Sequence, residues 1–252
     1  MKVYIPKAVL FLHAFPLCFD MFSEQFKLLK ENNIPYIALD YPGFGEEPPS
    51  RMKPDIENLT DYVVSKIDAF GVEKIVPVGV SMGGYIIFDM WKRYKDLIEG
   101  MVLVSTRAEA DTQESRKARY ELIEKIRIEG KEILINVMLE NQTSPVTKEN
   151  PKKMRKLRCM MERASEEGLV NTLKALAERP DNREILSSID VPVLVIAGKD
   201  DDKITPPKVV KEIAEGIKGA EYKELENCAH LPPFENPKAF NKLLMSFLKR
   251  IF

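Results

Sequence analysis

The sequence predicts an α/β fold in which helices cover both faces of a mostly parallel, doubly wound β-sheet. Short apolar runs alternate along the chain with longer amphipathic stretches, which is the pattern of repeated strand and helix units. The runs do not alternate polar with apolar residues, as expected of strands that are buried on both faces. With 252 residues, 44% of them hydrophobic, the chain can build a substantial buried core.

The first predicted strand is residues 8–12, a run rich in β-branched and large apolar residues. The other predicted strands are residues 34–39, 74–80, 100–104, 191–197 and 221–225. A helix is predicted between the second and third strands, because apolar residues recur at helical spacing over residues 56–70 and stop before Gly71. Another amphipathic stretch, residues 85–94, follows the third strand. A final helix is predicted over residues 237–252.

Residues 107–183 differ from the rest of the chain, because they contain almost no strand signal. Two long amphipathic helices are predicted there, over residues 116–140 and 151–178, joined by the turn-rich segment 141–145. We interpret residues 107–183 as a helical cap over the strand ends, inserted into a core made of residues 1–106 and 184–252. The alternative interpretation is a second helical layer without a lid function.

Composition and charge exclude several classes of function. The 38 Lys and Arg residues balance 39 Asp and Glu residues, so the net charge of −1 favours neither a nucleic-acid surface nor a polybasic membrane anchor. No apolar run approaches the roughly 18 residues of a membrane span, and the first residues lack the apolar region of a secretory signal. We therefore expect a cytoplasmic protein with a small, neutral molecule as its partner.

Cysteine and histidine usage argues against disulfides and metal sites. The three cysteines, Cys18, Cys159 and Cys228, are widely spaced and form no Cys-x-x-Cys pair, so they are expected to be reduced thiols in the core. The two histidines, His13 and His230, do not have the spacing of metal ligands. No metal and no cofactor are expected.

The strongest local signal is the segment Gly79-Val80-Ser81-Met82-Gly83, which lies between a predicted strand and an amphipathic stretch. A serine on a sharp strand-to-helix turn has strained backbone angles, and glycines two residues before and after it avoid collisions in the bend. The hydroxyl then projects beside a helix N-terminus, which favours developing negative charge. Ser81 is therefore a candidate nucleophile, and the alternative is a serine that only caps a helix.

A serine nucleophile needs a base within hydrogen-bond reach and a third group that orients the base. His230 follows the last predicted strand, where it would overhang the C-terminal edge of the sheet, although it could also form only a local loop contact. The orienting acid should follow a buried strand, which directs attention to Asp200, Asp201 and Asp202. Side chains diverge along the chain and like charges repel, so only one of the three is expected to face the imidazole.

The segment after the first predicted strand contains His13 and Phe15. The backbone N–H of Phe15 is placed to join that of Met82 in stabilising an oxyanion, because both would lie at strand ends beside the serine turn. His13 is expected to hold this loop through its ring nitrogens. The glycine-rich turn at residues 40–45 lacks the dinucleotide-binding fingerprint, so no nucleotide site is expected there.

Taken in order, these and other segments resemble the α/β-hydrolase family, specifically its small cap-bearing carboxylesterases and 3-oxoadipate enol-lactonase-like hydrolases. The similar segments are residues 13–17, 39–45, the turn around Ser81, and residues 105–112, 175–180, 204–207 and 229–231. The resemblance implies an α/β-hydrolase fold. It also implies these roles: nucleophile Ser81, base His230, an acid within residues 200–202, and an oxyanion hole formed by the N–H groups of Phe15 and Met82.

Three features depart from the pattern of that family. Ala14 stands where the family usually has glycine, which adds a methyl group where the backbone should approach the substrate. The segment between Gly198 and Thr205 has one residue more than the pattern of the family. Counting forward from Gly198 therefore selects Asp201 as the acid, and counting back from Thr205 selects Asp202. We favour Asp201, because the strand end fixes position more firmly than the loop after it. Only 12 residues precede the first histidine, so the sheet is expected to be trimmed at its first edge.

These observations favour a serine hydrolase that cleaves carboxylic esters or lactones of small acyl substrates through an acyl-enzyme. The same residues would also support perhydrolysis, in which hydrogen peroxide attacks the acyl-enzyme. A hypothesis of a different class is a non-catalytic protein that binds a small ligand in the same pocket. Met138, Met160 and Met161 are candidates for lining an apolar acyl pocket, because methionine adapts to varied shapes.

Overall fold

The computed structural model describes residues 4–252, and its centre is one six-stranded sheet. The strands are β1 (Ile5–Leu12), β2 (Tyr36–Leu39), β3 (Val72–Val80), β4 (Met101–Val104), β5 (Val193–Gly198) and β6 (Glu221–Leu225). All neighbouring strands are parallel, in the order β2-β1-β3-β4-β5-β6. The six predicted strands are therefore present, and the largest shift is at β1, which begins at Ile5 rather than at residue 8. The expectation that the strands are buried on both faces is wrong for β2 and β6, which are only partly buried because they form the two edges of the sheet.

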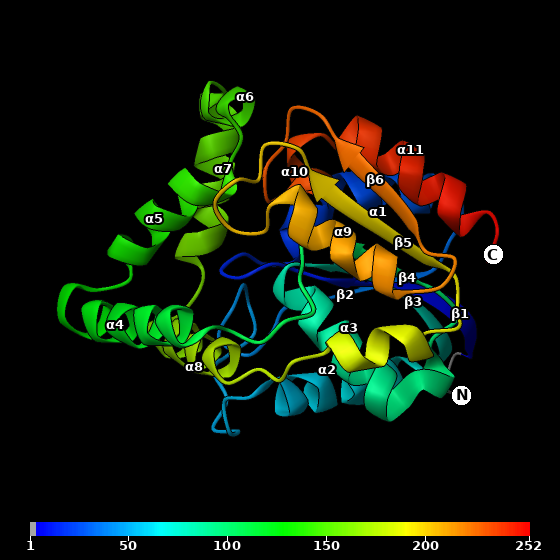
Figure 1. Cartoon of the computed structure of the whole chain (residues 1–252), viewed down its shortest axis with the longest axis horizontal. Coiled ribbons are helices and arrows are strands. Elements are labelled where there is room, and N and C mark those ends of the chain that lie inside the picture. The colour runs from blue at the N-terminus through cyan, green and yellow to red at the C-terminus, as the bar shows by residue number, and fades with distance from the viewer. Residues whose placement is uncertain (1–3) are drawn as a thin grey trace.

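Two apolar layers lie on opposite faces of this sheet. Along β1, Val9 and Phe11 contact one layer while Leu10 and Leu12 contact the other, because successive side chains of a strand point to opposite faces. The helices α1 (Ser23–Glu31) and α11 (Pro237–Leu248) cover the first face (Figure 1). The helices α2 (Ile56–Phe70), α3 (Met82–Tyr94) and α9 (Pro207–Gly216) cover the second.

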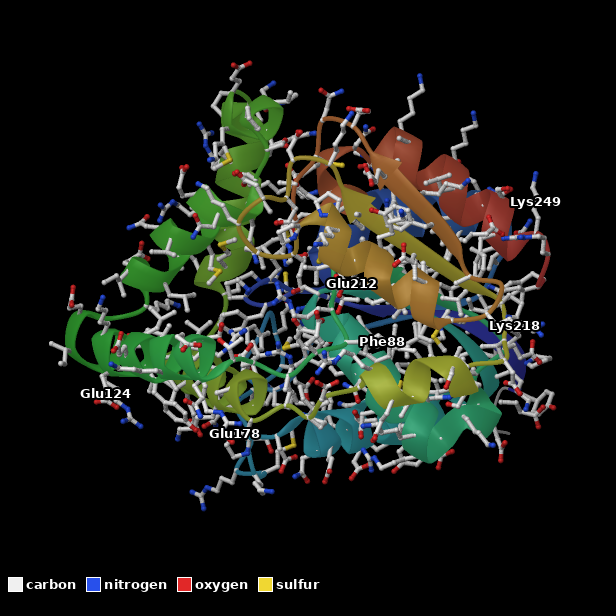
Figure 2. All side chains as sticks on the ribbon, viewed as in Figure 1. Phe88, Glu124, Glu178, Glu212, Lys218 and Lys249 are labelled. Carbon is white, nitrogen blue, oxygen red and sulfur yellow. The ribbon has the colours of Figure 1, made fainter. Side chains whose placement is uncertain are left out.

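Side chains fill the space between the sheet and its helices. Figure 2 shows Phe88 of α3 inside the molecule, where it is fully buried, and Lys218 and Lys249 at the periphery. Cys18 and Cys228 are buried free thiols, as expected, whereas Cys159 is exposed because it lies on an outward face of its helix. Within residues 4–252 no helix combines the length and apolarity needed to cross a membrane.

Five helices lie between β4 and β5 and are called the inserted helices below: α4 (Gln113–Glu129), α5 (Glu132–Gln142), α6 (Pro145–Lys148), α7 (Pro151–Glu162) and α8 (Glu166–Ala177). In Figure 1 they extend from the strand ends to one side of the sheet. The remaining elements are α10 (Pro232–Glu235) and the 3₁₀ turns η1 (Phe19–Phe22), η2 (Lys95–Leu97) and η3 (Arg183–Ser188).

The prediction of two long helices in this region was wrong, because each is divided by a local stop. Gly130 has a φ of 83°, which ends α4 before α5 begins. Ser165 caps α8 by accepting a hydrogen bond from the Gly168 N–H at 3.0 Å, so α7 and α8 are separate helices. Apolar spacing continues across both stops and therefore could not reveal them.

Candidate active site

Ser81 lies on the turn between β3 and α3, with φ of 52° and ψ of −108°. A positive φ is strained for a residue with a side chain, and it persists only where the surroundings hold it. The Ser81 N–H donates to the Val104 carbonyl at 2.8 Å, and the Thr106 hydroxyl donates to the Ser81 carbonyl at 2.8 Å. The end of β4 therefore holds both sides of the turn, a role of Thr106 that the sequence had not revealed.

The glycines around Ser81 allow close approach of backbones. A Cβ atom on Gly79 would lie 2.5 Å from the carbonyl carbon of Gly83. A Cβ atom on Gly83 would lie 2.3 Å from the Leu12 carbonyl oxygen at the end of β1. Both distances are far below van der Waals contact, so these positions require glycine for the reason that the sequence predicts, a lack of space in the bend.

His230 and Asp201 form a buried pair. The His230 Nδ1 atom lies 2.6 Å from the Asp201 Oδ2 atom, and both side chains are almost fully buried. The Thr205 hydroxyl donates to Oδ2 at 2.7 Å, while the Ile204 and Thr205 N–H groups donate to Oδ1 at 3.1 and 3.2 Å. The carboxylate is thus fixed from both oxygens, which orients the ring so that its Nε2 atom is free for chemistry.

Electrostatics favour the ionised form of Asp201. Burial raises the pKa of its carboxyl group, but the charge of a protonated His230 and hydrogen bonds from His230 and Thr205 lower it. The net pKa lies below its ordinary value. Asp201 therefore stays negative at neutral pH and can stabilise a positive charge on the ring.

The neighbouring aspartates point elsewhere. Asp200 and Asp202 line a separate cavity of about 390 Å³, together with Lys148 and Lys203. Asp202 is exposed, whereas Asp201 is buried against His230. Of the two residues that the sequence offered as the acid, the structure brings Asp201 to the histidine.

The two backbone N–H groups predicted to stabilise an oxyanion lie at neighbouring strand ends. Within residues 4–252, neither the Phe15 N–H nor the Met82 N–H donates a hydrogen bond to another group of the chain. Met82 is the first residue of α3, where N–H groups have no partner within the helix. Both groups are thus available to a ligand.

Gln142, at the end of α5, was not predicted and connects two of these loops. Its side-chain Nε2 donates to the Phe15 carbonyl at 2.7 Å, and its own backbone carbonyl accepts the His230 N–H at 3.1 Å. The side chain is buried, and it contacts the loop of the predicted oxyanion hole from the helical side. Nothing in its local sequence distinguishes it from a solvated helix-end residue.

His13 holds the loop that follows β1. Its Nδ1 atom lies 3.1 Å from the Ala14 carbonyl, and its Nε2 atom accepts the Tyr41 N–H at 3.4 Å. Complete burial lowers the pKa of His13 to about 3, so the ring is neutral. The Asp40 carboxylate 3.9 Å away is therefore not in an ion pair with it at neutral pH.

A cavity of about 420 Å³, called the Ser81 cavity below, brings these groups together. Its wall from the sheet edge includes Phe15, Ser81, Thr205 and His230. Its other residues include Tyr85 and three residues of the inserted helices, Met138, Gln142 and Leu176. Four basic side chains that were not predicted as site residues also line it: Arg107, Arg119, Arg179 and Lys203. Met138 thus lines the cavity, whereas Met160 and Met161 are buried in an apolar cluster because α7 turns them towards neighbouring helices.

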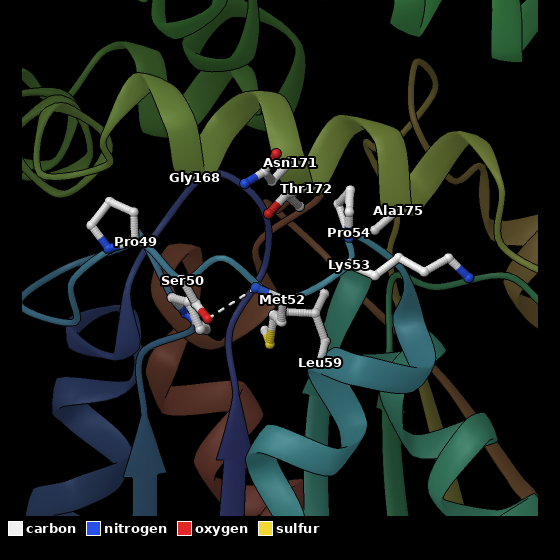
Figure 3. A pocket seen from close by; sticks show the side chains of 11 residues that line it. Pro49, Ser50, Met52, Lys53, Pro54, Leu59, Gly168, Asn171, Thr172 and Ala175 are labelled. Carbon is white, nitrogen blue, oxygen red and sulfur yellow. Dashed lines mark hydrogen bonds between the residues drawn. The ribbon is translucent and has the colours of Figure 1, made fainter.

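A second hollow lies between α8 and residues 49–54 (Figure 3). It holds about 20 Å³, which is room for roughly one water molecule and not for an ester. None of the predicted site residues lines it. In the described part of the chain, no group of three or more His, Cys, Asp and Glu side chains is arranged to hold a metal ion.

Comparison with known proteins places the chain in a family. A sequence model described as alpha/beta hydrolase fold matches residues 7–237. The chain belongs to the α/β-hydrolase family. The fold and the family resemblance predicted from the motifs are therefore confirmed.

Individual members of the α/β-hydrolase family match nearly the whole chain. It is 27% identical to the AB hydrolase superfamily protein YisY of Bacillus subtilis, over 96% of this chain and 91% of that protein. The malate-bound structure of a thermophilic esterase from Thermogutta terrifontis is 30% identical with a TM-score of 0.93, covering 99% and 92% of the two chains. The enol-lactonase from Burkholderia xenovorans is 27% identical with a TM-score of 0.87, covering 98% and 92%.

Proposed function

We propose that this α/β-hydrolase is a serine hydrolase that cleaves carboxylic esters or lactones through an acyl-enzyme. The observation that carries the proposal is the His230–Asp201 pair, joined at 2.6 Å, in which His230 lines the same cavity as Ser81. The similarity to an esterase and to an enol-lactonase supports it, because both names describe cleavage of an ester bond.

The first half of the proposed reaction acylates Ser81. The Ser81 hydroxyl attacks the ester carbonyl while His230 Nε2 accepts its proton. The negative charge on the carbonyl oxygen is stabilised by the N–H groups of Phe15 and Met82, and the positive charge on the imidazole by Asp201. His230 then donates the proton to the departing alcohol oxygen, which leaves the acyl group on Ser81.

The second half hydrolyses this acyl-enzyme. Water enters, loses its proton to His230 and attacks the acyl carbonyl, and the same two N–H groups stabilise the oxyanion. The carboxylic acid then leaves and the serine regains its proton. For a lactone, the alcohol remains tethered to the product, and the bonds formed and broken are the same.

We propose further that residues 107–183 form a cap. Support comes from the Ser81 cavity, because Met138 and Gln142 of α5 and Leu176 of α8 complete the wall opposite the sheet edge. In this proposal the rest of the chain supplies the reacting groups and the cap shapes the space for the substrate. The cytoplasmic location and the absence of a nucleic-acid or membrane partner stay predictions from the sequence.

The test is hydrolysis of p-nitrophenyl esters of increasing acyl length by the wild type and by Ser81→Ala. We expect turnover in the wild type and a loss of at least about 1,000-fold in the variant. Ester turnover that persists in Ser81→Ala would refute the proposal. No turnover of any ester, with bound ligand retained in Ser81→Ala, would favour the non-catalytic hypothesis, and activity that requires hydrogen peroxide would favour perhydrolysis.

A further inference from the structure

The Ser81 cavity carries a surplus of positive charge. Four basic side chains line it, and among its described lining residues only Asp111 and His230 are other ionisable groups besides Tyr85. The chain as a whole has a net charge of −1, so the surplus is local to the cavity. A charge excess in a partly enclosed space attracts ligands of opposite sign.

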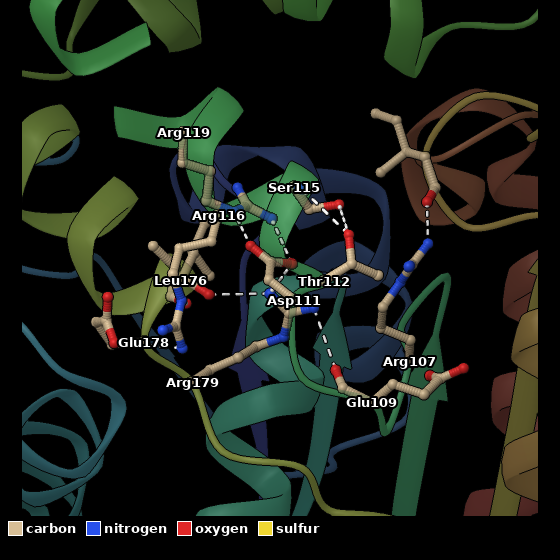
Figure 4. A network of polar contacts seen from close by, with 12 residues as sticks. Arg107, Glu109, Asp111, Thr112, Ser115, Arg116, Arg119, Leu176, Glu178 and Arg179 are labelled. Atoms are coloured by element: carbon tan, nitrogen blue, oxygen red, sulfur yellow. Dashed lines mark hydrogen bonds and ion pairs between the residues drawn. The ribbon is translucent and has the colours of Figure 1, made fainter. Parts of the chain in front are cut away.

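Two of the basic residues are already paired with Asp111. Arg179 Nη1 and Arg119 Nε donate to its two carboxylate oxygens, each at 2.5 Å (Figure 4). Arg179 is 1% exposed, donates to the Leu176 and Glu109 carbonyls and lies over the Tyr85 ring. These contacts identify Arg119, Arg179 and Asp111 as a fixed part of the cavity wall, with one positive charge left over.

Arg107 is different. Its Nη2 group donates to the Ile204 carbonyl, and within the described chain no carboxylate lies within salt-bridge distance of its guanidinium group. Figure 4 shows Arg107 apart from the cluster of side chains around Asp111. Lys203, the fourth basic residue, is half-exposed and lies 3.6 Å from Glu140, so it is partly neutralised.

The position of Arg107 places its charge close to the reacting groups. It directly follows Thr106, which donates to the Ser81 carbonyl. The carbonyl that holds its guanidinium belongs to Ile204, whose N–H donates to Asp201. The guanidinium therefore reaches from the loop beside the nucleophile to the loop that holds the acid.

A guanidinium group with free N–H donors in such a space matches a carboxylate, because the planar group can donate two parallel hydrogen bonds to the two oxygens. A purely apolar substrate would displace the water that hydrates the Arg107 guanidinium and would offer no hydrogen-bond acceptor in its place, which is unfavourable. The cavity thus fits an acidic substrate better than the small neutral one expected from the composition.

We propose that the substrate carries a carboxylate in addition to the ester or lactone bond that is cleaved, and that Arg107 binds this carboxylate. The inference rests on the proposed hydrolase function, since it names the substrate class of the same site. The fixed Arg119–Asp111–Arg179 group adds a weaker positive field, and the half-exposed Lys203, partly neutralised by Glu140, adds a smaller attraction for the anion.

The test compares two esters that differ only at the far end of the acyl chain, 4-nitrophenyl hexanoate and mono(4-nitrophenyl) adipate. The readout is the ratio of their kcat/KM values after subtraction of spontaneous hydrolysis, because a general loss of activity cancels in the ratio. We expect the wild type to favour the adipate ester about tenfold or more, and Arg107→Gln to lower the ratio at least about tenfold.

Two further variants serve as controls. Arg107→Lys keeps the charge without the planar group, so it should retain part of the preference and shows that the site folds with a changed side chain. Arg127→Gln removes an exposed arginine of α4 that pairs with Glu124 and does not line the cavity, so the ratio should stay at its wild-type value. A wild type that favours the hexanoate ester, or an Arg107→Gln variant that keeps the wild-type ratio, would overturn the inference.

Calorimetry separates this inference from the proposed function. Adipate should bind to Ser81→Ala, and about tenfold more weakly to Ser81→Ala combined with Arg107→Gln. Hydrolysis of both esters without any effect of Arg107 would leave the hydrolase proposal intact and remove the carboxylate site. Adipate binding that depends on Arg107, without hydrolysis of either ester, would support the carboxylate site and refute the hydrolase proposal.

Discussion

The two walls of the Ser81 cavity are built in different ways. At the sheet-edge wall, backbone and short side chains hold the acidic group behind His230: the Asp201 carboxylate accepts hydrogen bonds from His230, from the Thr205 hydroxyl and from the backbone N–H groups of Ile204 and Thr205. On the opposite wall, long side chains from separate segments share one carboxylate, since Arg119 and Arg179 both pair with Asp111. The first arrangement suits groups that must be positioned within tenths of an ångström, and the second suits groups that shape a binding space.

The largest expected effect tests the sheet-edge wall. Asp201→Asn keeps the size of the side chain and removes the charge that stabilises a protonated His230, so we expect kcat/KM for a p-nitrophenyl ester to fall about 10³- to 10⁴-fold. Asp202→Asn changes an exposed neighbour and should alter kcat/KM less than about threefold. Steady-state kinetics of the two variants provide the comparison, and a more damaged Asp202 variant would contradict the assignment of the acid.

The next effect tests the opposite wall. Asp111→Asn would leave Arg179, which is 1% exposed, with a buried charge and no carboxylate, so we expect a loss of about 3 kcal/mol in the free energy of unfolding. Glu124→Gln removes one partner of an exposed pair with Arg127 and should cost less than about 0.5 kcal/mol. Urea unfolding measures both, and equal losses would show that the buried cluster does not stabilise the wall.

The loss of stability in Asp111→Asn is expected to depend on pH. Burial raises the pKa of Asp111, but the hydrogen bonds and charges of Arg119 and Arg179 lower it by a larger amount. The pKa of Asp111 in the folded chain therefore lies below its ordinary value. Its stabilising contribution is therefore complete above the unfolded pKa of about 3.9 and is lost as the pH falls through the folded pKa. The stability gap between wild type and Asp111→Asn should narrow in acid, and a constant gap down to low pH would exclude this cause.

The smallest expected effect concerns the turn at Ser81. Gly83→Ala would bring a methyl group to 2.3 Å from the Leu12 carbonyl, which belongs to rigid backbone, so we expect a loss of about 2 kcal/mol. In Gly100→Ala the nearest atom is the end of the Ile251 side chain, which can move, so the loss should stay below about 1 kcal/mol. Thermal unfolding of the two variants measures both losses of stability. A larger loss in Gly100→Ala than in Gly83→Ala would show that the backbone around Ser81 moves to accommodate the methyl group.

The sequence predicted features that depend on neighbouring residues. The strand, the turn and the helix around Ser81 follow from a few adjacent residues, and so do the six strands of the sheet. The stops at Gly130 and Ser165 were missed, because helical spacing of apolar residues continues across them. A single glycine or serine in an amphipathic stretch carries too little signal to divide it.

Features that depend on distant contacts were beyond the reach of the sequence. Arg179 and Asp111 are 68 positions apart, and in the sequence each resembles an ordinary solvated charge. Gln142 meets the Phe15 loop across 127 positions. Asp201 could be preferred to Asp202 only because a strand end preceded it, while the hydrogen bonds from Thr205 that fix it required the folded loop.

Under the proposed function, the contacts of Gln142 also bear on how a substrate enters. One residue at the end of α5 is bonded to the Phe15 loop through its side chain and to the His230 loop through its backbone. Any swing that lifts this end of α5 from the core breaks both hydrogen bonds together and releases the loops of His230 and Phe15 in the same movement. Turnover by such a swing would require the proposed catalytic groups to be reassembled in every cycle. Entry beside the half-exposed Lys203, with α5 in place, leaves them assembled throughout.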